Sequence, residues 1–400
     1  MVLLRFQTCF IRECCDLVIQ VLLTVRSDWD QKRCGPYQSY ILEAGARERP
    51  NLSILLGHRV TKIMWEDEKS QCLKATGVNF QHSPGSEMLT VKANREVLLA
   101  TGSMQSPQLL ELSGVGDPAV LEPAGINVVK AMQQVGRNFQ EQTKNAVQYM
   151  PHDNQFEGSG PPSAIAFPNV YQVLGEELAT QTYHETLAGL PDWAQYLEVS
   201  GYILDAKTYL PILRTQLDNL FLQREAAVEQ FFTVTPSTGT VGIDLWNLIV
   251  LSRGSIHINS NDPWKQPVVD PAYFQHPLDL RLQTYSTIQA RGVYDVAPLS
   301  DLINYEMEPG LERLPKNASY SDWQDYVMDS FTSVWHPIAT LAMMKEELGG
   351  VVDSRLKVYG MDNVRAVDAS VLPVQLSAHL SSSLYGIAEK AAEMIQQDWS

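Results

Sequence analysis

The first regular pattern along the chain lies between residues 51 and 80, where short apolar runs alternate with polar turns. The runs are Leu52–Leu56, Arg59–Trp65 and Ala75–Phe80, and each is rich in β-branched or large apolar residues. Runs of this length between polar turns predict strands. Three of them in close succession predict a small sheet layer.

A second pattern predicts a strand, a tight turn and a helix. Glu96–Ala100 is a nearly continuous apolar run, typical of a strand buried on both faces. It stops at residues 101–103, and Pro107 then stands at an expected first helical position. Proteins of the α/β class use this unit to bring backbone N–H groups against a ligand.

The middle of the chain differs in texture from its two flanks. From about residue 150 to 335 it is richer in aromatic residues and prolines, and Arg253–Ile258 alternates like a half-buried antiparallel strand. This change predicts a separate domain. After Gly350 the α/β texture returns with a strand at Val364–Val367 and a closing helix, for which Ser381–Ser383 offer caps.

Composition narrows the function classes. The chain has 400 residues and 44% hydrophobic content, enough for about two or three domains. Its 30 basic and 46 acidic residues give a net charge of −16, which disfavours nucleic acid or an anionic membrane surface as a partner. The apolar stretch Leu17–Val25 is too short to span a bilayer. A small molecule is the expected partner, and oligomeric state is left open.

Cysteine spacing argues against a metal site. The five cysteines show no C-x-x-C pair and no histidine at zinc-finger spacing, so no metal is expected. Two sequons, at Asn51 and Asn317, suit a secreted protein, whereas the start of the chain is a poor signal peptide. Localisation, secreted or cytoplasmic, therefore stays open.

One motif resembles a dinucleotide-binding fingerprint by spelling alone. Residues 114–119 spell G-x-G-x-x-A, but they follow a predicted helix, whereas a true fingerprint follows a buried strand. We expect a turn that ends the helix. No P-loop and no G-x-S-x-G elbow occurs in the sequence.

Two of the eight histidines are candidates for catalysis. His336 lies in an apolar stretch between a tryptophan and a proline, and His379 lies just before the closing helix. Apolar surroundings disfavour the charged imidazolium and leave a neutral ring that can accept a proton. The 42 residues between them leave open whether they share a site.

Residues 96–116 closely resemble the second signature of the glucose-methanol-choline (GMC) oxidoreductases. Val135–Gln142, Ser252–His257 and Val269–Tyr273 are similar to further family segments, and the stretch from His336 to His379 resembles the closing segment. The texture is nearest the fungal glucose oxidase and aryl-alcohol oxidase branch. The resemblance covers about residues 50–400.

The resemblance implies a mixed α/β fold: an incomplete FAD-binding Rossmann-like domain plus a substrate domain with an antiparallel sheet. Residues 1–25 would be an unassigned leader, 26–149 and 341–400 two parts of the FAD-binding domain, and 150–340 the substrate-binding domain. Family members begin with a strand and a G-x-G-x-x-G turn, which this sequence does not contain. We therefore expect an amino-terminally truncated chain.

The resemblance also implies site residues. His336 would be the general base that takes the alcohol proton, and His379 would hydrogen-bond the same oxygen. The positive end of the closing helix would point at the flavin ring. The FAD-binding residues would be Val60 at the adenine, Thr101, Gly102 and Ser103 along the ADP portion, and Asp368, Ala369 and Leu380 between the pyrophosphate and the flavin.

The implied function is FAD-dependent oxidation of an alcohol, with hydride transfer to flavin and with oxygen or a quinone as electron acceptor. Fungal secondary metabolism is one expected setting. Two alternatives stay open: a non-redox cyclase or dehydratase on the same fold, and an inactive truncated fragment.

Overall fold

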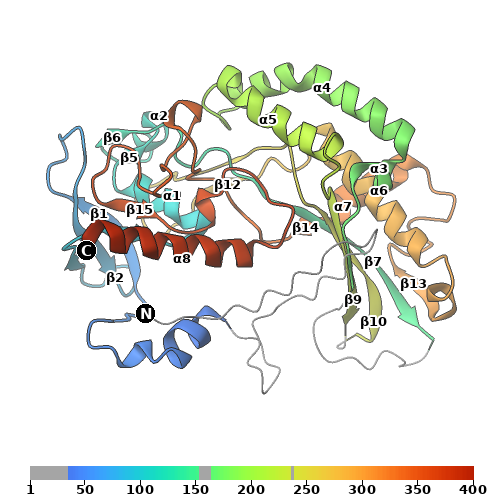
Figure 1. The fold of residues 1–400 in the computed structure, drawn as a ribbon, viewed down its shortest axis with the longest axis horizontal. Helices are drawn as coiled ribbons and strands as arrows, with labels where there is room; N and C mark the ends of the chain where they lie inside the picture. The colour runs from blue at the N-terminus through green and yellow to red at the C-terminus, as the bar shows by residue number, and fades with distance from the viewer. Residues whose placement is uncertain (1–34, 153–163, 236–237) are drawn as a thin grey trace.

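The computed structural model describes residues 35–152, 164–235 and 238–400. The leader expected at residues 1–25 lies outside the described residues. Figure 1 shows two halves side by side. One holds the small sheet of β1 (Arg59–Trp65) and β2 (Ala75–Gln81) together with the helices α1 (Gly102–Leu112) and α8 (Leu380–Trp399). The other holds the large sheet, covered by α4 (Glu176–Val199), α5 (Ala206–Phe221) and α6 (Pro277–Val293).

The small sheet is an antiparallel meander of β1 (Arg59–Trp65), β2 (Ala75–Gln81) and β3 (Leu89–Lys92). The strands predicted at 59–65 and 75–80 are confirmed. The strand predicted at 52–56 is wrong: the segment makes no ladder, and its large apolar side chains are exposed. An apolar run without alternation gives a strand no polar face to turn toward water.

The predicted unit of strand, turn and helix is confirmed, with two differences. β4 (Val97–Leu99) pairs in parallel with β15 (Val364–Ala366). Leu99 is buried, but Leu98 is 48% exposed, so the strand is not covered on both faces as expected.

The helix α1 (Gly102–Leu112) begins five residues before Pro107, so the predicted start at the proline is wrong. A proline inside a helix leaves the carbonyl four residues earlier without its N–H donor. That carbonyl belongs to Ser103, and it accepts a hydrogen bond from the Thr340 hydroxyl at 2.7 Å. Gly114, at φ +84°, then ends the helix, which confirms the predicted turn.

The second half is built on a six-stranded sheet, antiparallel in all its pairings, with strand order β13-β7-β10-β9-β8 and β14 beside β7. Residues along β7 alternate between buried and half-buried. The antiparallel sheet predicted for this region is confirmed. The strands are β7 (Thr143–Pro151), β8 (Ile165–Ala166), β9 (Val228–Thr235), β10 (Thr240–Asn247), β13 (Ile303–Glu308) and β14 (Thr332–Ser333).

Helices form most of the remaining second half. The sequence analysis did not predict them, because prolines and aromatic residues interrupt their apolar pattern. Pro191 and Pro211 lie inside two of them. They are α3 (Val170–Leu174), α4 (Glu176–Val199), α5 (Ala206–Phe221), α6 (Pro277–Val293) and α7 (Tyr320–Ser330).

Short elements complete the described part of the chain. The predicted strand near residue 255 is confirmed as β11, which pairs antiparallel with β12. These short elements are β5 (Val115–Gly116), α2 (Pro118–Leu121), β6 (Lys130–Ala131), β11 (Ser255–His257), β12 (Val268–Asp270) and the helical turns Tyr37–Glu43, Ala46–Glu48, Leu299–Asp301, Glu346–Leu348 and Ala369–Val371.

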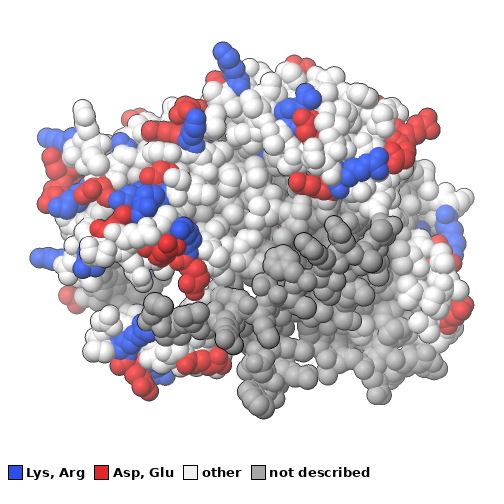
Figure 2. Space-filling view, in the orientation of Figure 1, with Lys and Arg blue, Asp and Glu red and all other residues white. Residues whose placement is uncertain are grey.

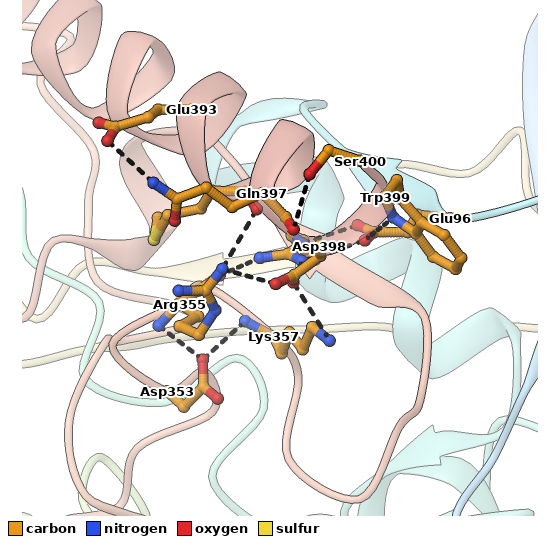
Figure 3. A network of polar contacts seen from close by, with 11 residues as sticks. Glu96, Asp353, Arg355, Lys357, Glu393, Gln397, Asp398, Trp399 and Ser400 are labelled. Atoms are coloured by element: carbon orange, nitrogen blue, oxygen red, sulfur yellow. Dashed lines mark hydrogen bonds and ion pairs between the residues drawn. The ribbon is translucent and has the colours of Figure 1, made fainter.

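The closing helix is confirmed as α8 (Leu380–Trp399), and its carboxyl end is fixed by ion pairs. Figure 3 shows Asp398 beside Arg355 and Lys357, and the Trp399 indole beside Glu96. The fully buried Arg365 guanidinium contacts both Glu96 and Asp398. These contacts join the end of the helix to β4 and β15.

On the face drawn in Figure 2, acidic and basic side chains intermix around β1, β2 and α8, and the described residues form no continuous basic patch there. Within the described part of the chain, no helix is long and apolar enough to cross a bilayer.

Candidate active site

The two candidate histidines meet, although 42 residues separate them in sequence. Their ring centroids lie 5.7 Å apart, with the ring planes at 80°. Trp246 of β10 stands edge-on to both, at 5.6 Å from His379 and 6.5 Å from His336. Both imidazoles are therefore within reach of one ligand atom.

His336 is held by the segment that precedes β7. The His336 backbone N–H donates to Glu141 Oε1 at 2.9 Å, and its Nδ1 lies 2.7 Å from Gln142 Oε1. The Gln375 side-chain amide donates to the His336 carbonyl at 3.0 Å. Backbone, ring and carbonyl each have a partner, so the ring position is fixed from three sides.

Burial lowers the pKa of His336 to about 4, and the positive charge of His379 adds to this effect. The imidazole is therefore neutral at pH 7. A neutral ring in a partly dry site is a suitable proton acceptor.

His379 has a buried acid as its partner. Its Nε2 lies 2.6 Å from Glu229 Oε1, and the Glu229 side chain is fully buried on β9, directly across the ladder from Trp246. The second carboxylate oxygen, Glu229 Oε2, has no hydrogen-bond partner among the described residues. A buried carboxylate at this distance fixes the orientation of the imidazole ring.

Sequence reasoning missed Glu229, although one signal was present. It is the only charged residue in Val228–Thr235, and a lone carboxylate that becomes buried in a strand requires a partner. The acid Glu141 and the amide Gln142 lie in Val135–Gln142, a segment that the sequence identifies only by its similarity to the family.

Glu141 is the second unusual carboxyl group of the site. Burial raises its pKa to about 7, although the backbone N–H groups of His336 and Gln142 donate to it and oppose that rise. The group accordingly sits near half-protonation at neutral pH.

The structure also brings most of the predicted FAD-binding residues together. The Gly102 N–H donates to Asp368 Oδ2 at 2.9 Å, and the Ser103 hydroxyl donates to the Pro337 carbonyl at 2.7 Å. The turn that ends β4 thus contacts both the 368–370 turn and the His336 segment. Asp368 also accepts from the Ser106 hydroxyl and from the Ser370 N–H, so protein donors already fill its carboxylate.

Ala369 and Leu380 lie deeper in the same region. They pack in an apolar cluster with Ile338 and Ala339, next to the two histidines in sequence. α8 begins at Leu380, and its cap position is His379, whose side chain does not cap it. The predicted capping by Ser381–Ser383 is wrong because the helix has already begun there. His379 therefore leaves the first N–H groups of α8 uncapped, and these groups form the positive end of the helix dipole.

Val60 lies apart from the histidines, in a cavity that it shares with Thr101. The cavity has a volume of about 380 Å³ and opens between the small sheet and α1. Its other lining residues are Gly57, His58, Arg59, His82, Gln105, Gln108, Leu109, Leu112 and Trp264.

No three histidine, cysteine, aspartate or glutamate side chains come together as metal ligands within the described ranges. The donor set around His336 and His379, with two imidazoles and one paired carboxylate, is suited to proton transfer.

Comparison with known proteins gives one family. Two models described as GMC oxidoreductase match residues 12–144 and 250–388. A glucose oxidase of Penicillium chrysogenum is 37% identical over 354 residues, which cover 88% of this chain and 57% of that protein. A dehydrogenase of Armillaria gallica is 32% identical and is covered to 58%. The chain thus spans less than two thirds of these relatives.

Solved structures share the fold. A fungal aryl-alcohol oxidase has a TM-score of 0.75 at 26% identity, over 92% of this chain and 64% of that one. An FAD-dependent oxidoreductase from Chaetomium thermophilum has a TM-score of 0.76 at 24% identity, over 92% and 65%, which shows the fold alone.

The predicted mixed α/β fold is confirmed, and FAD is confirmed as the cofactor of the family. Family models matching at both ends of the chain and a fold shared with the solved structures lead to one conclusion: this chain belongs to the GMC oxidoreductases.

Proposed function

We propose that the protein oxidises an alcohol with FAD, using His336 as general base and His379 as the partner that steadies the same oxygen. The observation that carries this proposal is the pair of imidazoles 5.7 Å apart in contrasting environments. The half-buried His336 ring contacts the neutral amide of Gln142, whereas the His379 ring contacts the carboxyl group of Glu229. Neighbouring titratable groups in opposed environments indicate separate acid and base roles.

In the proposed reaction, His336 and His379 have different roles. His336 takes the hydroxyl proton of the alcohol while the C–H bond of the carbinol carbon breaks. His379, held by Glu229, would hydrogen-bond the same oxygen and stabilise the negative charge that develops there. Bound FAD would supply the acceptor for the hydride. The proton ends on His336, the electron pair leaves with the hydride, and the alcohol becomes a carbonyl compound.

The residues present fit the cofactor at three places. The cavity of about 380 Å³ would take the adenosine end at Val60 and Thr101. The turn at Gly102 and Ser103 would follow the phosphates. The uncapped start of α8 at Leu380, beside Ala369, would face the flavin, where its positive end favours a reduced anionic ring. Because protein donors fill the Asp368 carboxylate, this residue would act by shaping the turn.

Flavin reduction by an alcohol under anaerobic conditions tests the proposal. Loss of the visible flavin band on adding an alcohol substrate supports oxidation. A product formed while the band stays unchanged would instead indicate the cyclase or dehydratase alternative. A protein that takes up no FAD would support the inactive fragment. The acceptor, oxygen or a quinone, and a place in fungal secondary metabolism stay predictions.

The base assignment has its own test. Replacing His336 with alanine should slow flavin reduction by about 10²–10⁴-fold, the usual contribution of a general base. Stopped-flow absorbance of the flavin measures the rate. An unchanged rate would move the base to His379 or to another group.

A further inference from the structure

The Gln142 side-chain amide has one orientation that satisfies both of its neighbours. Its Nε2 donates to the Leu248 carbonyl oxygen at 2.7 Å, and its Oε1 lies 2.7 Å from Nδ1 of His336. If the amide rotated by 180°, its oxygen would face the Leu248 oxygen, and two acceptors would meet without a proton. Gln142 is fully buried, so such a mismatch would carry the full cost of an unmade hydrogen bond.

This orientation determines where the imidazole proton lies. An amide oxygen only accepts, so Nδ1 of His336 must donate. A neutral imidazole has one N–H, and a proton on Nδ1 leaves a bare lone pair on Nε2. We propose that Gln142 is a positioning residue that locks His336 in the tautomer whose Nε2 accepts protons. The role as base rests on the proposed function, whereas the tautomer follows from the hydrogen bonds alone.

Backbone contacts keep Gln142 and His336 in register. The Gln142 carbonyl accepts from the Val334 N–H at 3.1 Å, and Gln140 exchanges two backbone hydrogen bonds with Ile338 at 3.0 and 3.3 Å. The two segments therefore run as a short antiparallel pair with His336 at its centre. A change in the Gln142 side chain leaves this pairing intact, because the pairing uses only main-chain atoms.

The charged neighbours of His336 cannot replace Gln142 in this role. Glu141 accepts from the His336 backbone and from the Gln142 backbone, and its hydrogen bonds do not include the ring. His379 faces the ring, and Glu229 lies behind His379. Charge from these groups changes how readily the ring is protonated, whereas the choice between Nδ1 and Nε2 depends on the acceptor at Nδ1.

Histidine ¹⁵N NMR of the full chain measures the tautomer without any cofactor. The chain has eight histidines, and the His336 signals are those lost in His336→Ala. At neutral pH we expect the wild type to carry its proton on Nδ1. In Gln142→Met the acceptor is gone, and the proton should redistribute toward Nε2. A wild-type proton on Nε2, or the same tautomer in Gln142→Met, would overturn the proposal.

Gln283→Met is the matched control. Gln283 is also fully buried, and its amide donates to the Leu245 carbonyl at 3.2 Å and to the Asn145 side chain at 3.0 Å, with no hydrogen bond to either histidine. The same substitution there removes a buried amide of the second half and should leave the His336 tautomer unchanged. This comparison separates a tautomer effect from a general loss of stability.

Gln142→Glu keeps the proposal testable if the methionine variant does not fold. A carboxylate still accepts from Nδ1, so the tautomer should stay, but its negative charge favours the imidazolium. The NMR titration midpoint of His336 should rise by about one pH unit or more. An unchanged midpoint would contradict the contact between residue 142 and the ring.

Flavin reduction supplies a second, separate readout. With flavin and alcohol bound, the Gln142→Met variant should reduce flavin about 10–100-fold more slowly than the wild type, at similar apparent substrate affinity. For comparison, losing the group that fixes the histidine tautomer in a serine protease triad lowers the rate on the order of 10⁴-fold. If the NMR result holds and no alcohol is oxidised, the proposed function fails and the tautomer assignment stands. If the alcohol is oxidised but wild-type His336 carries its proton on Nε2, the proposed function stands and the tautomer assignment fails.

Discussion

An acid and a base share one backbone hydrogen bond at the candidate active site: the His336 N–H donates to the Glu141 carboxyl group. The pKa of His336 falls to about 4 and that of Glu141 rises to about 7, in both cases chiefly through burial. Both shifts favour the neutral form. Perturbed groups of this kind gather where chemistry occurs more often than in the rest of a fold.

The raised pKa of Glu141 predicts a pH dependence of stability. The unfolded carboxyl ionises near 4.5 and the folded one near 7, so the folded state holds the proton longer. The stabilisation of the folded state by this group is therefore complete below pH 4.5. It falls by up to about 3 kcal/mol as the pH rises to 7. In Glu141→Gln this decline should vanish. Chemical denaturation at pH 5 and pH 7, for variant and wild type, measures the difference.

The lowered pKa of His336 makes stability depend on pH in the opposite direction. Its folded pKa lies below its unfolded value of 6.5, so its stabilisation is present above pH 6.5 and is lost as the pH falls toward 4. The Glu141→Gln comparison cancels this term, because both proteins keep His336. Equal slopes for variant and wild type would mean that Glu141 is ionised in the folded protein.

At the residue scale, sequence could predict the two histidines but not their partners. His336 and His379 stand in apolar context, which is visible in one dimension. Glu229 and Gln142 become partners only through strand pairing and the approach of the two segments, which depend on contacts far apart in the chain. Their roles in catalysis stay predictions.

At the scale of elements, the end of α8 depends on a buried cation. Arg365 is fully buried against Glu96, whose side chain is 4% exposed. Arg365→Met should cost about 3–5 kcal/mol, because the Glu96 carboxylate would stay buried without its cation. Denaturant unfolding measures the loss. Adding Glu96→Leu to the variant should recover part of it, and a double variant as unstable as the single one would contradict the explanation.

The control for this element is an exposed ion pair. Arg313 and Asp329 pair at 3.3 Å with side chains 47% and 72% exposed. Arg313→Met should change stability by less than about 1 kcal/mol, because water screens the pair.

The strands β1, β2, β4 and β15 were predictable from their apolar residues, although a similar run at residues 52–56 forms no strand. The long helices of the second half were not predictable. α4 contains Pro191, and its buried positions include two threonines, Thr182 and Thr186, so its apolar face is weak in sequence. Tertiary packing against α5 completes the helix. The unexpected exposure of Leu98 also depends on tertiary structure, because a strand face is buried only if another element covers it.

At the scale of the whole molecule, the candidate active site lies where the two halves meet. β9 and β10 bring Glu229 and Trp246 from the large sheet, and the start of α8 brings His379 from the other half (Figure 1). The expected division into domains at residues 149 and 340 stays a prediction.

The cavity between the small sheet and α1 gives a prediction for the full chain. Thr101→Tyr adds a ring to a space of about 380 Å³, and it should weaken FAD binding at least about 10-fold without unfolding the protein. Flavin fluorescence after ultrafiltration measures binding. Gln181→Tyr, on the exposed face of α4, is the control. Equal retention of FAD by both variants would exclude this cavity as a cofactor site.

Trp335 stands immediately before His336, 85% exposed and with left-handed backbone at φ +66°. An indole in water emits light that overlaps the near-ultraviolet absorption of a flavin, so a flavin arriving beside His336 would quench it by energy transfer. The fluorescence of Trp335 would therefore report whether flavin is bound beside His336. Comparing Trp335→Phe with the wild type would isolate that signal from the other seven tryptophans.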